Sequence, residues 1–319
     1  MPRLSKYELL TVVTAVATLA LIGVGALVRT TGSGLGCPDW PLCHGALLPP
    51  LQKGPLIEYS HRSLASLVGV LIVATAITTL RIRREDVTVR TLAVVSVPLL
   101  ALQAWLGKVT VERELPPEVV AVHLATALVL FAVLSLIAVF AFLGPARRTV
   151  DSRQRRGLLR VALGATVVMG GIVLVGSYVV GADAGFACTD WPGCPQARIP
   201  FFDGDRLQHI HWLHRLTVLA GFAAVALVAF AANSLREPAP MLRRAASVLL
   251  GLYVLQIAIG ALNIWSDLSE AARVGHLVAG SAIWALLVTI TVAGRFEPGP
   301  RTVDAAERRE SRQMGDARV

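Results

Sequence analysis

The stretch Glu58–Arg62, which reads EYSHR, has a counterpart in His211–Arg215, which reads HWLHR. In each stretch a His-Arg pair stands at the start of a long apolar run. A second histidine stands at the start of a later apolar run, 62 residues after the first histidine in both cases. The chain therefore carries two matched pairs of histidines. They are His61, His123, His214 and His276.

The composition is that of a membrane protein. Of 319 residues, 55% are hydrophobic and 16% charged, whereas a soluble domain has about 25% charged residues. Crossing a ~30 Å hydrocarbon core takes about 20 apolar residues, and the backbone inside that core must form helices. We predict an all-α integral membrane protein with eight transmembrane helices. They lie roughly at 8–30, 58–80, 90–110, 118–143, 158–181, 208–233, 243–265 and 271–294.

The similarity between the halves extends beyond the histidines. The segments Cys37–Cys43 and Cys188–Cys194 both read C-x-D-W-P-x-C, at an offset of 151 residues. Farther along, the offset is 153, and it then persists across loops and apolar runs. The residues matched at 153 are Arg62 with Arg215, Gln103 with Gln256, Gly107 with Gly260 and His123 with His276. We predict two tandem, pseudo-symmetric four-helix bundles, related by an axis along the membrane normal because each has an even number of spans.

The net charge of +9 reflects membrane topology and excludes a nucleic-acid-binding function. Of the 30 Lys and Arg residues, 21 lie before the first span, after the last, or in the connections Arg81–Arg90, Pro145–Arg160 and Arg236–Arg244, which alternate with the two long loops. Basic residues favour the cytoplasmic side, so both termini are predicted in the cytoplasm of a multi-pass cell-membrane protein. We divide the chain into an N-terminal half (1–150), a C-terminal half (151–296) and a disordered cytoplasmic tail (297–319).

Paired histidines near one face of a membrane are typical haem ligands, because two opposed helices can supply both axial positions of one haem iron. A single membrane histidine is more often a hydrogen-bonded contact between helices. Four at duplicated positions favour function instead. We expect each histidine three to five residues inside its helix, on the extracytoplasmic side. Two histidines outside the repeat, His44 and His209, are expected in loops.

The repeat breaks at one position. The residue 153 positions after Glu58 is His211, so the first half has a carboxylate where the second has an imidazole. Glu58 precedes His61 by three residues and shares its helix face, where a carboxylate can transfer protons during an oxidation. The alternative is an interfacial glutamate in the outer loop. We predict that the first half is catalytic and the second holds a cofactor, while the role of His211 stays open.

Other polar residues near the histidines allow simpler interpretations. Arg62 and Arg215 are equally well explained as partners of haem propionates or as arginines that extend to the membrane surface. Gln103 and Gln256 are expected to form hydrogen bonds between helices.

The four cysteines lie in the two long outward loops, in a compartment where disulfides persist. Each pair closes a small loop, so we expect the disulfides Cys37–Cys43 and Cys188–Cys194. A staple that shapes a loop over the haem is at least as well supported as a redox relay. A four-thiolate metal site is a third possibility, although the C-x2-C spacing of zinc sites is missing.

As a set, the Cys37–Cys43 loop, E-x-x-H-R at 58–62, His123, H-R at 214–215 and His276 resemble the haem A synthase family, and the resemblance covers all eight spans. It implies that His61 and His123 hold the substrate haem O, that His214 and His276 hold a haem b cofactor, and that Glu58 is essential. The implied reaction oxidises a methyl group of haem O to the formyl group of haem A, by two hydroxylations and loss of water.

The resemblance also implies partners, namely a haem O synthase that supplies the substrate and a terminal oxidase that uses the product. The sequence does not identify the electron acceptor or donor, and a homo-oligomer stays open. The rival interpretation is a di-haem b-type electron-transfer cytochrome with the same four ligands. Two haems at one level and the unmatched Glu58 count against it, and a transporter gives no reason for paired histidines.

The distribution of basic residues predicts a membrane topology that reporter fusions can test. Reporters fused after residues 45, 85, 150 and 195 should read outside, inside, inside and outside, because positive loops stay in the cytoplasm. The measurement compares a reporter that is active only outside with one that is active only inside. A cytoplasmic signal at 45 or 195 would contradict the predicted orientation.

Overall fold

The computed structural model describes residues 4–144, 147–148, 152–195, 199–200, 204–236 and 239–297. Within these residues the chain forms eight α-helices, each long and apolar enough to cross a membrane. The predicted all-α architecture with eight spans is confirmed. The helices are α1 (Lys6–Thr30), α2 (Lys53–Ile82), α3 (Val87–Glu112), α4 (Pro117–Leu143), α5 (Arg153–Gly181), α6 (Arg206–Asn233), α7 (Pro240–Trp265) and α8 (Glu270–Ala293).

The helix ends extend beyond the predicted spans, because hydropathy locates only the apolar part of a helix. Helix α2 begins at Lys53, five residues before its predicted start. Glu58 is consequently the sixth residue of α2 and is only 2% exposed. The interpretation of Glu58 as an interfacial residue of the outer loop is therefore wrong.

Two helices begin with capping boxes, which satisfy backbone N–H groups that have no partner in the first turn. At α1, Ser5 Oγ accepts from Glu8 N (3.2 Å) and Glu8 Oε2 accepts from Ser5 N (2.8 Å). At α6, Asp205 Oδ1 accepts from Gln208 N (2.8 Å), and Gln208 Oε1 accepts from Asp205 N (3.4 Å). These caps fix where the two helices enter the bundle.

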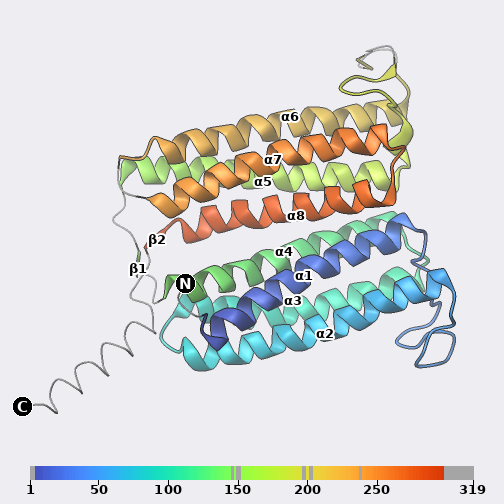
Figure 1. Cartoon of the computed structure of the whole chain (residues 1–319), viewed down its shortest axis with the longest axis horizontal. Coiled ribbons are helices and arrows are strands. Elements are labelled where there is room, and N and C mark those ends of the chain that lie inside the picture. Colours follow the sequence, from blue (N-terminus) through green and yellow to red (C-terminus); the bar gives the residue numbers. More distant parts are fainter. Residues whose placement is uncertain are drawn as a thin grey trace, which may run out of the picture.

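The helices form two four-helix bundles, α1 to α4 and α5 to α8, which lie side by side (Figure 1). Corresponding helices run in the same direction, as expected for a repeat of four spans. The described parts of the two long loops, 31–52 and 182–205, lie at one end of the molecule, here named the disulfide end (Figure 1). Helices α2, α4, α6 and α8 all begin there. Separate hydrophobic clusters fill the bundles, one around Ile72 and Leu134 and a larger one around Leu249 and Leu287.

Helix α8 joins the bundles by packing against both α1 and α4. Trp284 Nε1 on α8 donates to the backbone oxygen of Leu128 on α4 at 3.1 Å. Nearer the disulfide end, an Arg273 Nη2 donates to Thr30 O at 3.0 Å. Ile22 and Phe131 belong to the same apolar cluster as Leu128 and Trp284. The two halves therefore share a packed interface made largely by one helix.

The opposite end is closed by arginines and by a short strand pair. Arg83, in the turn after α2, donates to Phe140 O at 3.1 Å and to Gly144 O, and so binds carbonyls that the end of α4 leaves unpaired. The segments β1 (Arg147–Arg148) and β2 (Phe296–Glu297) pair antiparallel. The predicted disordered tail thus starts with a strand residue at 297, and residues 298–319 lie outside the described part of the chain.

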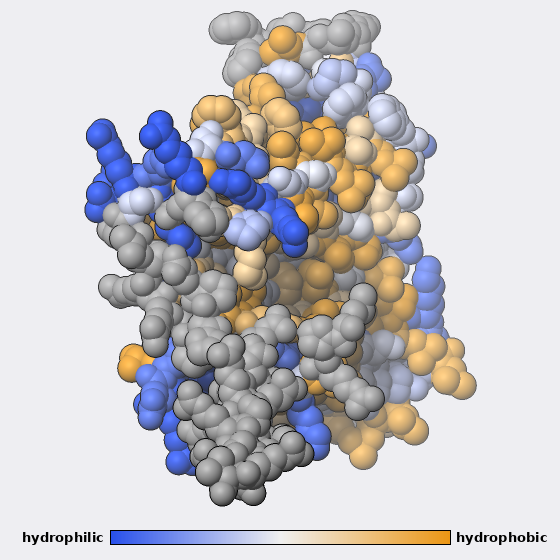
Figure 2. Space-filling model, turned by 60° about the vertical axis from the view of Figure 1, so that its left-hand side comes forward, coloured by the Kyte–Doolittle hydropathy of each residue, from blue (hydrophilic) through white to orange (hydrophobic). Residues whose placement is uncertain are grey.

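The outer surface of the bundles is apolar along the helices. Hydrophobic side chains cover most of the flank in Figure 2, and hydrophilic ones gather toward the end that carries β1 and β2. Exposed residues such as Val16, Leu67, Val167 and Leu219 sit in mid-helix. Mid-helix exposure of large aliphatic and aromatic side chains is what contact with lipid requires.

The packing of the second bundle makes a stability prediction at Gly221. A Cβ on this α6 residue would lie 2.1 Å from the hydroxyl of buried Tyr253, which donates to Val218 O at 2.9 Å. Gly221→Ala should lower the stability by about 1–3 kcal/mol, because the core cannot expand around the methyl group. The midpoint of thermal unfolding in detergent measures it.

Gly251 on α7 is the matched control, since it is exposed and its added Cβ would meet nothing within 4 Å. Gly251→Ala should leave the midpoint unchanged or raise it slightly, because alanine favours the helix by about 1 kcal/mol. Equal destabilisation by both substitutions would contradict the packing described for Tyr253.

Candidate functional site

All four repeat histidines lie at one level near the disulfide end. His61 and His214 are the ninth residues of α2 and α6, and His123 and His276 are the seventh residues of α4 and α8. At 1.5 Å per residue they sit about 9–12 Å along their helices. The expected depth of three to five residues was too shallow, because the helices begin earlier than the apolar runs.

A glycine on the neighbouring helix faces each of the first histidines. A Cβ on Gly25 of α1 would lie 3.2 Å from Cε1 of His61. In the second half, a Cβ on Gly176 of α5 would lie 3.2 Å from Cε1 of His214. These distances are shorter than ordinary van der Waals contact. A larger residue in place of Gly25 or Gly176 would therefore displace the ring that it faces.

The second histidine of each pair has the same kind of neighbour. A Cβ on Gly107 of α3 would lie 3.4 Å from Cε1 of His123, and a Cβ on Gly260 of α7 would lie 3.3 Å from Cε1 of His276. Each of the four imidazole rings therefore packs against a glycine of a neighbouring helix, here named the glycine seat of that ring. The two halves therefore repeat the glycine seats as well as the histidines.

Two glutamines connect neighbouring helices at this level, as predicted. Gln103 Nε2 on α3 donates to the backbone oxygen of His123 at 3.0 Å and lies 3.3 Å from its ring Nε2. Gln256 Nε2 on α7 donates to the backbone oxygen of His276 at 2.9 Å. These contacts fix the turn of helix that carries the second histidine of each half.

The histidines themselves have unused hydrogen-bonding capacity. Among the described residues, Nδ1 of each of the four is buried without a hydrogen-bond partner. A buried polar atom normally has one, so four exceptions at matched positions fit imidazoles that are held for a ligand. The ring centroids of His214 and His276 lie 6.5 Å apart.

That separation fits one metal ion between the two rings. A metal–imidazole bond is about 2 Å long, which puts the centroids of two opposed ligands roughly 6 Å apart. No group of three or more His, Cys, Asp or Glu residues that could bind a metal occurs within the described ranges. Because a porphyrin supplies the remaining ligands of its iron, a two-histidine site fits haem better than a bare ion.

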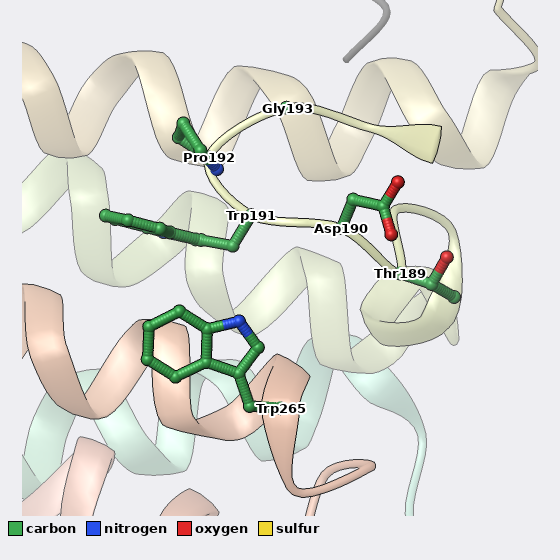
Figure 3. Close-up of a pocket in the computed structure, with 6 residues that line it drawn as sticks. All are labelled: Thr189, Asp190, Trp191, Pro192, Gly193 and Trp265. Carbon is green, nitrogen blue, oxygen red and sulfur yellow. The ribbon is translucent and has the colours of Figure 1, made fainter. Parts of the chain in front are cut away.

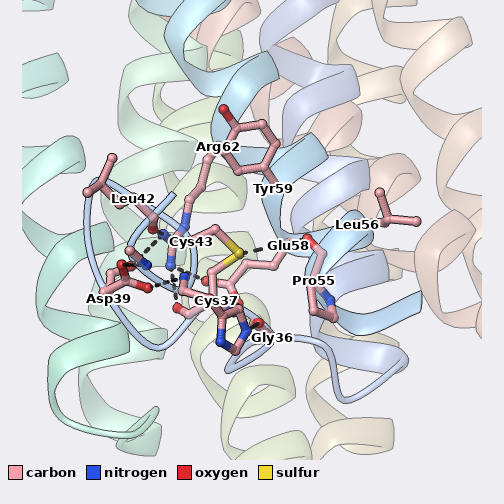
Figure 4. The surroundings of a disulfide bond; sticks show 12 residues. Gly36, Cys37, Asp39, Leu42, Cys43, Pro55, Leu56, Glu58, Tyr59 and Arg62 are labelled. Carbon is pink, nitrogen blue, oxygen red and sulfur yellow. Dashed lines mark hydrogen bonds and ion pairs between the residues drawn. A yellow bond between two sulfur atoms is a disulfide. The ribbon is translucent and has the colours of Figure 1, made fainter. Parts of the chain in front are cut away.

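Glu58, about one turn before His61 on α2, is bound to the first disulfide loop (Figure 4). Its Oε2 accepts from Cys37 N at 2.7 Å, and its Oε1 pairs with Arg62 Nη2. The same guanidinium donates to Cys37 O at 2.8 Å. The carboxylate, the arginine and one residue of the loop thus bind each other in a closed set of three contacts.

The second half has a similar arrangement without the carboxylate. His211 occupies the equivalent position on α6, is buried, and has its Nε2 3.3 Å from Arg215 Nη2. Arg215 donates to Cys188 O at 3.0 Å and to Asp190 O at 2.8 Å. His211 therefore lies under the second disulfide loop and contacts its arginine.

Both predicted disulfides, Cys37–Cys43 and Cys188–Cys194, are present. Within the first loop, Asp39 accepts from His44 N at 2.6 Å and from Gly45 N at 2.8 Å. The bond from Gly45 and then the one from His44 hold the pKa of the Asp39 carboxyl below its usual value.

The two disulfide loops differ in what their tryptophans contact. Trp191 and Trp265 stack edge to face at 5.9 Å, on one side of a shallow groove over the second half (Figure 3). In the first half, the ammonium of Lys108 lies 6.0 Å from the ring centroid of Trp40. The remaining groove residues are Thr189, Asp190, Pro192 and Gly193.

Sequence reasoning missed several features of the site. It did not foresee that Arg62 and Arg215 bind loop carbonyls, although both follow a loop of the same C-x-D-W-P-x-C pattern. Their contact with haem propionates stays a prediction. His44 is a loop residue as expected, and its Nε2 lies 2.9 Å from Gly36 O. The expectation for His209 was wrong, since it is an exposed residue of the first turn of α6.

Comparison with known proteins agrees with this geometry. The family COX15-CtaA, described as cytochrome oxidase assembly protein, matches residues 8–288. The Heme A synthase of Symbiobacterium thermophilum is 31% identical over 282 residues, which cover 86% of this chain and 90% of that protein. That of Geobacillus thermodenitrificans is 30% identical, covering 86% and 87%, and that of Bacillus licheniformis is 29% identical, covering 86% and 92%. The match over residues 8–288 and the relatives of 30% and 31% identity show that this chain, with its paired histidines, belongs to the haem A synthase family.

Proposed function

We propose that this protein oxidises a methyl group of haem O to the formyl group of haem A. The methyl group becomes an alcohol, a second hydroxylation gives a geminal diol, and the diol loses water to leave the aldehyde. One observation carries the assignment of roles within the chain: two matched histidine sites have a buried carboxylate, Glu58, in one of them only. The site with the carboxylate is the catalytic one.

In the first half, His61 and His123 bind the iron of the substrate haem O. Gly25 and Gly107, which back the two rings, set the ring positions. Glu58 lies one helical turn from His61 on α2 and accepts protons released as the methyl group is oxidised. Its burial excludes bulk water from this step.

In the second half, His214 and His276 hold a haem b. Their 6.5 Å centroid separation and partnerless Nδ1 atoms support this role. A bound haem b would supply one-electron transfer beside the substrate site. Among the described residues, His211 occupies the position on α6 that corresponds to Glu58, and on this ground we assign the second half to holding the cofactor.

The proposed setting is the cell membrane, with both termini in the cytoplasm and the disulfide end outside, where disulfides persist. A haem O synthase supplies the substrate from the lipid bilayer, and a terminal oxidase receives the product. Each hydroxylation is a two-electron oxidation of the methyl carbon. If the oxygen atom comes from water, an external electron acceptor takes the two electrons, and if it comes from O2, an external donor supplies two electrons to reduce the second oxygen atom to water.

Replacing Glu58 tests the catalytic assignment. Glu58→Gln keeps the size of the side chain and removes its charge, so conversion should fall about 100-fold or more, as for loss of a general base. The measurement is pigment extraction from cells that express the variant together with a haem O synthase. Haem O or the alcohol should accumulate while haem b stays bound.

The unmodified protein is the positive control in the same cells. Haem A produced by it supports the enzyme, whereas haem b as the only bound pigment would indicate the electron-transfer cytochrome. Haem A formed by Glu58→Gln at the normal rate would show that the carboxylate has no catalytic part.

Gly176 tests the haem b assignment. Gly176→Val pushes a side chain against the His214 ring, so the affinity for haem b should fall about 10- to 100-fold, as when the surroundings of a metal ligand are disturbed. The haem b content of the purified protein measures it. Gly171, on the same helix with no atom within 4 Å of an added Cβ, provides the control: Gly171→Val should keep its haem b. Equal haem b content in both variants would contradict the proposal that Gly176 keeps His214 in position to bind haem b.

A further inference from the structure

Arg62 binds the first disulfide loop through three backbone carbonyls. Its Nη1 donates to Asp39 O at 2.7 Å and to Leu42 O at 2.8 Å, and its Nη2 donates to Cys37 O at 2.8 Å. Figure 4 shows the guanidinium reaching from α2 into the loop. One side chain therefore connects both sides of this non-helical loop to α2, the helix that carries His61.

Arg215 makes the same contacts in the second half. Its acceptors include the oxygens of Cys188, Asp190 and Gly193. At the loop offset of 151, these are the counterparts of the three carbonyls that Arg62 binds. One turn before Arg215, the second half has His211 in place of a glutamate, and the arginine binds its loop in the same way. The pairing with Glu58 is an addition found in the first half alone.

The first loop has little room to shift by itself. A Cβ on Gly36 would lie 2.5 Å from the backbone carbon of Gly54, so the loop and the start of α2 touch backbone to backbone. Cys37 follows directly, and its N–H is the one that Glu58 binds. The position of the loop therefore dictates where a donor meets the carboxylate.

We infer that Arg62 is a positioning residue, which fixes the Glu58 carboxylate and the Cys37–Cys43 loop as one unit beside His61. The inference rests on the proposed catalytic role of Glu58. An ionised carboxylate has about four acceptor sites on its two oxygens, so bonds to Arg62 and Cys37 leave capacity for a reacting group. Lysine cannot replace the arginine, because a single ammonium lacks the planar fork that serves several acceptors at once.

The first experiment measures haem O conversion by Arg62→Lys and Arg62→Gln. Displacement of a catalytic group by about 1 Å can cost roughly 100-fold in rate. We expect kcat to fall about 10- to 100-fold in both variants with KM nearly unchanged, whereas a higher KM with a normal kcat would show that Arg62 binds the substrate and would contradict the positioning role. Lys53→Gln, which removes the exposed first positive charge of the same helix, is the control and should retain the normal kcat.

The second experiment follows the loops without reference to catalysis. A membrane-impermeant phosphine reduces each disulfide in the purified holoprotein, and mass analysis after thiol labelling gives separate rates for the two loops. Arg62→Gln should speed reduction of Cys37–Cys43 about 10-fold or more and leave Cys188–Cys194 unchanged. Arg215→Gln should do the reverse. Gly36→Ala, which displaces the loop but keeps Arg62 and Glu58, should reproduce the lower kcat.

The outcomes separate the inference from the proposed function. Normal kcat together with a normal rate of Cys37–Cys43 reduction in Arg62→Gln would overturn the inference, even if Glu58→Gln is inactive. Rescue of kcat by Arg62→Lys would also overturn it, since charge alone would then suffice. If Glu58→Gln is fully active, the catalytic role fails, and the reduction rates alone still decide whether Arg62 holds the loop. Lower kcat with faster reduction in Arg62→Gln, but not in Lys53→Gln, supports it.

Discussion

Inside a bilayer, a backbone N–H or C=O can find its partner only within the protein, and this constraint governs the whole structure. It makes eight helices of the apolar runs and confines irregular backbone to their ends. The irregular segments at the disulfide end still contain carbonyls that no helix or strand pairs. Arg62 and Arg215 supply donors to those carbonyls, so the two loops are bound to α2 and α6, the helices that carry His61 and His214.

The two halves show which parts of the site are common and which are particular. Ring, glycine seat, glutamine and loop arginine recur in both bundles, so they serve whatever both histidine pairs do. Glu58 and His211 occupy one position with different chemistry, and the contact between Cys37 N and Glu58 belongs to the first half. This single difference between otherwise similar halves is the reason why our proposal assigns the chemistry to the first half.

Most of the fold could be predicted from the sequence, because long apolar runs and a persistent offset between the halves can both be read directly from the order of the residues. The four histidines and both disulfides followed from the same regularity. The glycine seats Gly25 and Gly176 were missed, since a glycine in an apolar run gives no sign of which ring lies across from it. The loop contacts of Arg62 were missed for a similar reason: an arginine near the membrane surface has many acceptors, and only the folded loop selects among them.

The even number of helices in each half has a consequence for ancestry. Two copies of a four-helix chain with the same orientation can be fused by a short connection alone, whereas a three- or five-helix unit would need an extra span to keep both copies upright. A homodimer of such a chain would carry two identical haem pockets about a two-fold axis. Once fused, the copies mutate separately. An exchange between glutamate and histidine at one position is then enough to make two equal histidine sites chemically different.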